Sequence, residues 1–247
     1  MVAKRPLILV VLAVILTASV VYGGTIVGSK HDLKSDWEAG SLLMEANLNN
    51  YGEVCVYCHT PHMANNVAPL WNRNTPAGPY NIYTSATMDT TPSSTPSGVS
   101  LACLSCHDGT IAVDAIINAP GSGANLTGPW YGQGAATYHF AMKEGANACG
   151  ECHTGGAAHD ARATYLGTDL SNDHPISMPY PTSAQDPQFN TPPDAQKGWG
   201  GISPTDVKLY SGKVECPSCH NVHNPDVSPF LRKSNAGSVL CTTCHIK

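Results

Sequence analysis

The chain of 247 residues carries a formal net charge of -5 at pH 7, and it contains 23 Gly, 19 Pro and three Phe. Its acidic balance argues against nucleic acid or an anionic membrane surface as a partner, because both repel negative charge. Many turn-forming residues and few large aromatic ones argue against long helices or sheets around a conventional hydrophobic core.

The first 23 residues have the three parts of a secretory signal peptide. Lys4 and Arg5 precede an apolar run from Leu7 to Val21, and small residues follow before Gly24. This run is shorter than the roughly 20 residues that cross a bilayer, so we expect cleavage and not a membrane anchor. The mature chain, residues 24–247, is predicted to have no membrane span and to be secreted through the periplasm, to the cell surface or the medium.

A C-x-x-C-H motif occurs five times and uses all ten cysteines. Two thiols at this spacing can bond to the two vinyl groups of one porphyrin, and the following histidine can ligate its iron. A redox dithiol, a zinc site or a disulfide framework would not need histidine at the same place five times. The sequence therefore predicts five covalently bound haem c groups. Their ligands are Cys55, Cys58 and His59; Cys103, Cys106 and His107; Cys149, Cys152 and His153; Cys216, Cys219 and His220; and Cys241, Cys244 and His245.

The stretches between the motifs are predicted to be mostly irregular. Residues 36–47 fit a short helix with one apolar side, and residues 72–98 fit an exposed loop rich in Thr, Ser, Pro and Asn. Residues 111–117 form an apolar run that fits either a short helix or a strand. Residues 119–134 fit a Gly/Pro loop, and residues 173–204 fit an extended, Pro-rich passage.

The predicted fold class is a multihaem cytochrome c formed by one domain, residues 24–247. Removal of the signal leaves about 45 residues per motif, which is little protein for a conventional core, so the haems must supply much of it. We expect mostly irregular chain with short helices and little sheet, wrapped around stacked haems.

Each iron also needs a second axial ligand. Five haems need five such ligands, and six histidines lie outside the motifs, which favours bis-histidine coordination and low reduction potentials. Methionine ligation would raise the potential, but with enough histidines we expect Met63, Met88, Met142 and Met178 to be packing residues. The candidate distal ligands are His31, His62, His139, His159, His174 and His223.

Geometry restricts two of these six histidines. His62 and His223 each follow a motif histidine by three positions, whereas two axial imidazoles lie on opposite faces of a porphyrin. Neither can therefore cap its own motif's haem, and each must reach a neighbouring iron. Near the third motif, His139 lies between two aromatic residues and is preferred to His159, which follows two glycines in a polar stretch.

The chain resembles the doubled-C-x-x-C-H multihaem cytochromes, and most closely the OmcE/OmcS-type subunits of extracellular cytochrome filaments. The specific runs are Cys55 to His62 and Cys103 to Gly109, and weaker similarity lies at residues 29–33, 174–176 and 216–247. The resemblance implies subunits polymerised end to end, with electrons passing along a continuous chain of haems. It also implies that His62 ligates an iron of the adjacent subunit.

The chain departs from the OmcE-like pattern, which has four haems with distal ligands matching His31, His62, His174 and His223. Residues 130–165 fit an insertion that carries the third motif and its own distal histidine.

The leading prediction is long-range electron transfer without enzymatic activity, as the repeating subunit of a filament. The redox partners are then other proteins or extracellular acceptors. The first alternative is a soluble periplasmic electron carrier in which His62 serves an iron of its own chain. The second is a multihaem oxyanion reductase, which would need an iron with an open position. All five motifs end in histidine, which favours electron transfer.

Overall fold

The computed structural model describes residues 25–34, 49, 51–120, 142, 162–200 and 206–246. The predicted signal peptide, the third motif, His139, His159 and the predicted helix 36–47 lie outside these residues. Most of the predicted insertion, residues 130–165, also lies outside them. Within the described ranges, no helix has both the length and the apolar character needed to cross a membrane.

Short helices and two-residue strands are the regular elements of the described chain. The helices are η1 (Val54–Tyr57), α4 (Gly98–His107), η3 (Arg162–Thr164), α6 (Cys216–Cys219), η4 (Ala236–Ser238) and α7 (Cys241–Cys244). The strands are β1 (Asn81–Ile82), β2 (Asp169–Leu170), β3 (Met178–Pro179) and β4 (Lys213–Val214). β1 pairs with β2 in parallel, and β3 pairs with β4 antiparallel.

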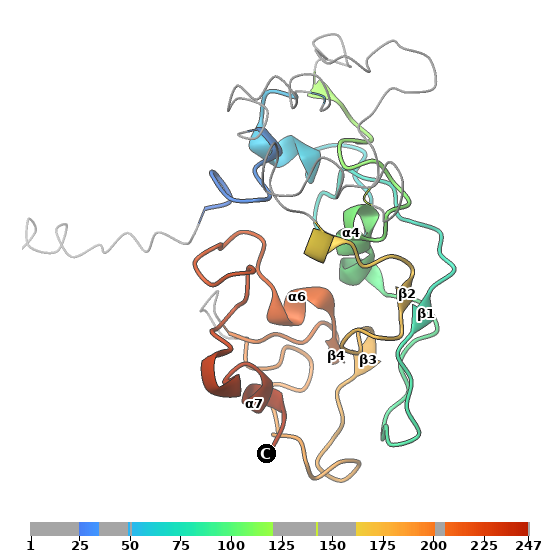
Figure 1. The fold of residues 1–247 in the computed structure, drawn as a ribbon, viewed down its shortest axis with the longest axis vertical. Coiled ribbons are helices and arrows are strands. Elements are labelled where there is room, and N and C mark those ends of the chain that lie inside the picture. Colours follow the sequence, from blue (N-terminus) through green and yellow to red (C-terminus); the bar gives the residue numbers. More distant parts are fainter. Residues whose placement is uncertain are drawn as a thin grey trace, which may run out of the picture.

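Each described haem motif forms one helical turn or ends a helix. The first motif includes most of η1, the second ends α4, and the fourth and fifth form α6 and α7. These four helices follow one another along the long axis of the molecule in the order η1, α4, α6 and α7 (Figure 1). The structure therefore arranges the described motifs in a row that follows their order in the sequence.

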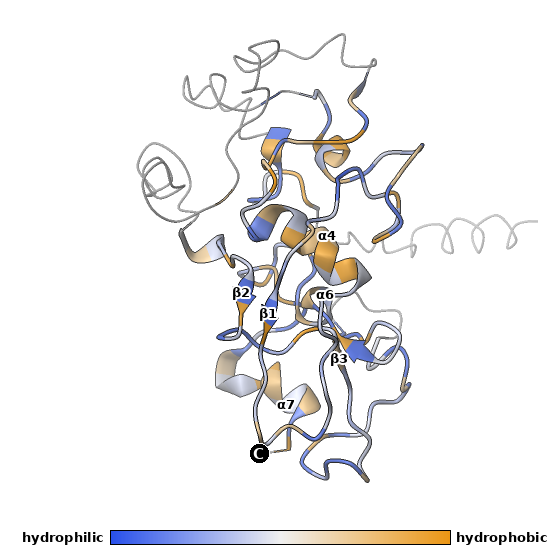
Figure 2. Ribbon diagram, turned by 90° about the vertical axis from the view of Figure 1, so that its right-hand side faces the viewer, coloured by the Kyte–Doolittle hydropathy of each residue, from blue (hydrophilic) through white to orange (hydrophobic). Residues whose placement is uncertain are grey.

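The hydrophobic core of the described chain is small. Ile82, Leu104 and Leu170 pack together and are almost fully buried, with Tyr80 and Ile176 against them. Hydrophobic residues lie along the ribbon in short, separated stretches (Figure 2). This core connects β1, β2 and α4, and it fixes the second motif relative to the chain that follows η3.

A buried arginine holds the segment after the second motif. Arg73 is fully buried, and its guanidinium donates to Ser105 Oγ at 3.2 Å, Ser105 O at 2.9 Å, Ala112 O at 2.7 Å and Val113 O at 2.7 Å. The expected helix or strand over residues 111–117 is absent from this described segment, which is irregular. The reason is that Arg73 takes up the carbonyl of Val113 and shares that of Ala112 with the N–H of Ala115, so these groups do not form a continuous helix or strand ladder.

Candidate haem-binding site

The motif histidines have their rings oriented by backbone carbonyls. Nδ1 lies 2.8 Å from Pro69 O in His59, 2.7 Å from Thr164 O in His107 and 3.0 Å from Pro229 O in His220. A carbonyl oxygen only accepts hydrogen bonds, so Nδ1 carries the proton and Nε2 keeps its lone pair. This is the usual arrangement of a histidine that ligates a metal through Nε2.

Three described motif histidines each face one distal candidate. The ring centroids are 6.1 Å apart for His59 and His223, 6.2 Å for His107 and His31, and 6.5 Å for His245 and His174. Two imidazoles on opposite sides of one metal ion have centroids about 6 Å apart, given metal–nitrogen bonds of about 2.0 Å. The three pairs therefore fit bis-histidine coordination of a haem iron at the first, second and fifth motifs.

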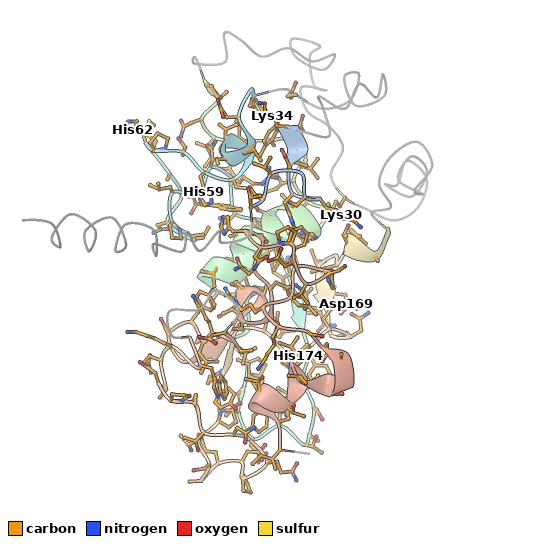
Figure 3. The ribbon with its side chains drawn as sticks, turned by 90° about the vertical axis from the view of Figure 1, so that its left-hand side faces the viewer. Lys30, Lys34, His59, His62, Asp169 and His174 are labelled. Carbon is orange, nitrogen blue, oxygen red and sulfur yellow. The ribbon has the colours of Figure 1, made fainter. Side chains whose placement is uncertain are left out.

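His62 and His220 are the two described histidines outside these pairs. His62 is exposed and lies at the edge of the molecule, whereas His59 lies further inside (Figure 3). Among the described residues, no ring contact joins His62 to His220. One motif histidine and one distal candidate are thus left over after the pairing.

The surroundings of His31 favour its neutral form. Its ring contacts Phe230 edge-on at a centroid distance of 4.5 Å, and its Nδ1 is buried without a hydrogen-bond partner. Desolvation lowers the pKa of His31 from 6.5 to about 4, and nearby His107, His223 and His220 add to this. The pKa values of His107 and His223 are also lowered, mainly by burial. Neutral imidazole is the form that ligates a metal.

The eight described cysteines are all free thiols. Burial raises the pKa of Cys58 and of Cys244 to about 12, which disfavours the thiolate that zinc binding or disulfide exchange requires. Across the described ranges, no three His, Cys, Asp or Glu residues form a cluster that could hold a metal ion. Within the described ranges, these thiols therefore give no support to a zinc site.

Cysteines of successive motifs lie close together in space. Cys106 contributes to the raised pKa of Cys58, the thiols of Cys103 and Cys216 hydrogen-bond each other, Cys241 contributes to the raised pKa of Cys219, and Cys219 to that of Cys244. These contacts connect the first motif to the second, the second to the fourth, and the fourth to the fifth. They agree with the row of motif helices in Figure 1.

The segments after the first and fourth motifs are structural repeats of each other. We call residues 55–72 the N-terminal unit and residues 216–232 the C-terminal unit. In both, the residue after the motif histidine donates its N–H to the carbonyl of a residue with positive φ: Thr60 to Leu70 at 2.8 Å, and Asn221 to Phe230 at 2.7 Å.

A second backbone hydrogen bond, to the second cysteine of the motif, is also repeated. It runs from Asn72 to Cys58 and from Arg232 to Cys219, at 2.8 Å in both units. The carbonyls that orient His59 and His220 belong to equivalent prolines, Pro69 and Pro229. Each unit also contains a histidine three positions after its motif histidine. The two units therefore share two backbone hydrogen bonds, the proline carbonyl that orients the motif histidine, and the position of a second histidine, although Ser228-Pro229 is a cis bond and Ala68-Pro69 is not.

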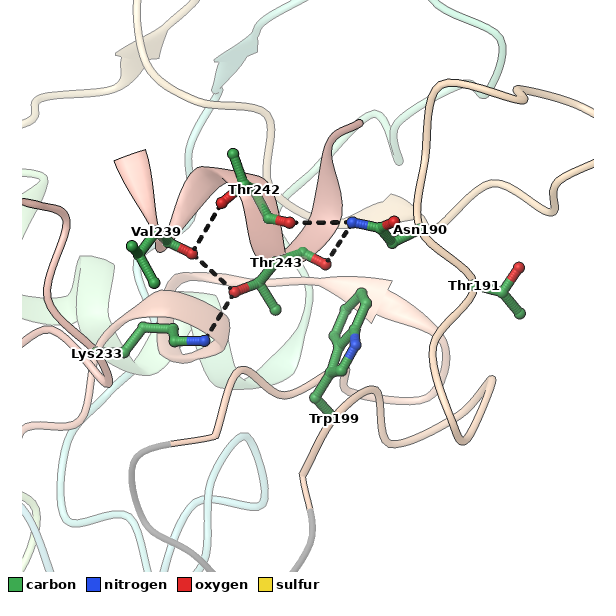
Figure 4. Close-up of a pocket in the computed structure, with 7 residues that line it drawn as sticks. All are labelled: Asn190, Thr191, Trp199, Lys233, Val239, Thr242 and Thr243. Carbon is green, nitrogen blue, oxygen red and sulfur yellow. Dashed lines mark hydrogen bonds between the residues drawn. The ribbon is translucent and has the colours of Figure 1, made fainter. Parts of the chain in front are cut away.

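The fifth motif is held by side chains outside it. Asn190 Nδ2 donates to Thr242 O at 3.0 Å and to Thr243 O at 3.3 Å, and Lys233 Nζ donates to Thr243 Oγ1 at 3.1 Å (Figure 4). These contacts line an open pocket of about 490 Å³ together with Thr191, Trp199 and Val239. The hydrogen bonds from Asn190 and Lys233 position α7. None of the residues that line the pocket is a cysteine or histidine, so the pocket is separate from the predicted haem ligands.

Sequence reasoning missed the pairing of the histidines and the repeat of the two units. The repeat has a weak sequence signal: C-x-x-C-H-x-x-H is followed by Pro69-Leu70-Trp71 in one unit and by Pro229-Phe230-Leu231 in the other. The interval before the proline differs by one residue, which hides the similarity. The pairing has no local signal, because its partners are 76 residues apart for His31 and His107.

Comparison with known proteins agrees with the motif analysis. Residues 210–247 match the family model described as doubled CXXCH motif, and this match includes the fourth and fifth motifs and His223. No curated protein matches the chain. The match and the motifs indicate a protein that binds haem c covalently and transfers electrons, with the doubled-motif pattern of multihaem c-type cytochromes.

Proposed function

We propose that the protein is the repeating subunit of an extracellular filament that conducts electrons through five closely spaced bis-histidine haems. The observation that carries the proposal is that the pairing of the described histidines leaves one motif histidine and one distal candidate, His220 and His62. Among the described residues, His220 has no ring contact with a distal candidate, and His62 is exposed and has no ring contact with a motif histidine. A bond from His62 of one copy to the iron at His220 of the next completes both.

The equivalence of the two units supports this bond. Within one chain, His223 of the C-terminal unit faces His59 of the N-terminal unit. In that pair, the second histidine of one unit faces the motif histidine of the other. If His220 is faced in the same way, its partner is the second histidine of an N-terminal unit in another copy, which is His62 of that copy. This relation is not reciprocal among the described histidines, so the proposal assigns His62 as the free ligand of each copy and the iron at His220 as its open position. Such a contact between different surfaces continues from copy to copy and builds a filament or a ring.

The surface around His62 is suited to contact with another copy. Met63 is 84% exposed, Leu70 is 54% exposed and Ile117 is 38% exposed. Asn118, next to Ile117, donates its side-chain amide to His62 O at 2.9 Å, so this apolar group lies beside His62. Large exposed apolar side chains around a polar anchor are typical of a surface that a protein partner covers.

Bound haem supplies reversible one-electron redox chemistry of its iron. The chain would hold it through the paired cysteines and the two histidines of each site, and it fixes the tautomer of the motif histidines through backbone carbonyls. Helices α4 and α6 bring Cys103 and Cys216 together, which keeps the second and fourth sites close. Ligation of every iron from both faces leaves no position for a substrate, so we propose electron transfer and no bond-making reaction.

The experiment is a comparison of two histidine variants by cryo-electron microscopy of the extracellular fraction. His62→Ala removes the ligand between copies, so we expect five attached haems and discrete subunits in place of filaments. His223→Ala is the matched control, because its iron belongs to its own chain, and we expect filaments to persist. Normal filaments from His62→Ala would contradict the proposal. Discrete wild-type particles with all axial ligands from one chain would indicate a soluble carrier.

A further inference from the structure

A buried carboxylate lies between the second and fourth motifs, where α4 meets α6. Glu215 directly precedes Cys216 and is 2% exposed. On the facing helix, Ser100 lies one turn before Cys103, and the thiols of Cys103 and Cys216 hydrogen-bond each other. The carboxylate therefore lies beside the cysteines of two predicted haem sites.

Three serine hydroxyls surround this carboxylate. Ser97 donates to Oε1, Ser100 donates to Oε2 at 2.5 Å and Ser177 donates to Oε2 at 3.0 Å. Two of the hydroxyl oxygens also accept a backbone N–H, from Cys216 at 3.0 Å for Ser100 and from Ser97 at 2.7 Å for Ser177. Their own protons are then directed at Glu215. This set of converging donors fits an ionised carboxylate, which only accepts hydrogen bonds.

The negative charge has no cation in contact with it among the described residues. The side-chain donors to Glu215 in that part of the chain are the three serine hydroxyls. Lys213, two residues earlier, donates its ammonium group to Ser93 Oγ at 3.0 Å instead. A charge that is buried and stabilised only by neutral groups acts over a longer range than a charge in water or in an ion pair.

We propose that Glu215 lowers the reduction potentials of the haems attached at the second and fourth motifs. Reduction adds one electron, from a neighbouring haem or a chemical reductant, and converts ferric to ferrous iron without breaking a bond. The site becomes more negative by one unit, and a fixed anion nearby opposes this change. The proposal rests on haem binding at Cys103 and Cys216, and it does not depend on whether the copies form filaments.

The test is a spectroelectrochemical titration of purified protein with its full haem content. In Glu215→Gln the side chain keeps its shape and loses its charge, so we expect the midpoints of about two of the five haems to shift upward. Glu53→Gln is the matched control, because Glu53 precedes the first motif but is exposed. We expect its titration to overlay that of the wild type. A Glu215→Gln curve that overlays the wild type, or that shifts downward, overturns the proposal.

A second variant gives a test of opposite sign. Ser97→Ala removes one hydroxyl that donates to the carboxylate of Glu215. The negative charge is then less compensated by hydrogen bonds, so the midpoints of the same two haems should shift downward. Ser97 uses its side chain for Glu215 and not to cap α4, so we expect this variant to fold and to bind haem. If Glu215→Gln does not accumulate with full haem content, an unchanged or raised midpoint in Ser97→Ala overturns the proposal. Loss of filaments alone would affect the proposed function and not this one.

Discussion

The number of CO molecules that each reduced chain binds tests the assignment of axial ligands. CO needs an open or weakly held axial position on ferrous haem. In an isolated copy, the pairs His59–His223, His107–His31 and His245–His174 close three irons, whereas the described residues place no second histidine at His220. With the third haem closed by its own distal histidine, an isolated chain should bind about one CO for five haems.

Assembly changes this count in a defined way. In filaments, His62 of the adjacent copy occupies the open position, so CO binding should fall close to zero. His62→Ala should bind about one CO per chain under all conditions. His223→Ala should bind about one CO per chain in filaments and about two when dissociated, because it opens the iron at His59 as well.

The assay is a difference spectrum of the dithionite-reduced protein with and without CO, with the haem content measured separately. Samples are taken before and after dissociation of the copies, and dissociation is verified by mass in solution. If dissociated wild-type chains bind no CO, the iron at His220 is capped within its own chain and the reasoning from leftover ligands is wrong. Saturation of several irons in the wild type would contradict the three pairs themselves.

Two further predictions concern stability. Arg73→Met should lower the free energy of unfolding by about 3 kcal/mol, because it removes the hydrogen bonds of a buried guanidinium to Ser105, Ala112 and Val113. Urea denaturation checks this, with the exposed Lys30→Met as control, and equal midpoints for both variants would contradict it. The pKa of His31 lies near 4 in the folded chain and near 6.5 when unfolded, so the unfolded chain binds more protons in acid. Stability should decrease as the pH falls from 6.5 toward 4, because burial, and an iron where His31 ligates one, keep this imidazole neutral in the folded chain. The decrease should be smaller in His31→Ala but not absent, because the pKa values of His107 and His223 are also lowered.

The haem attachment sites follow from local sequence, because one helical turn suffices to place two cysteines and a histidine around one porphyrin. The described motifs at Cys55, Cys103, Cys216 and Cys241 all lie on such turns. The exclusion of His62 and His223 from their own haems also followed from local geometry, and the structure places His223 across from His59. The segment 111–117 was not predictable in this way, because the carbonyl groups that decide its conformation bond to Arg73, about 40 residues earlier.

The sequence by itself determined the chemistry of this protein: the number of attachment motifs, the surplus of histidines and the acidic, turn-rich composition. A motif is a short local pattern, and composition and histidine number are sums over the residues, so none of these properties depends on a long-range contact. Only the tertiary structure decided which histidine faces which, that the two units are equivalent, and that Glu215 is buried between two motifs. These depend on segments such as residues 97–103 and 215–216 meeting in space, and the spacing of residues along the chain carries no record of such contacts.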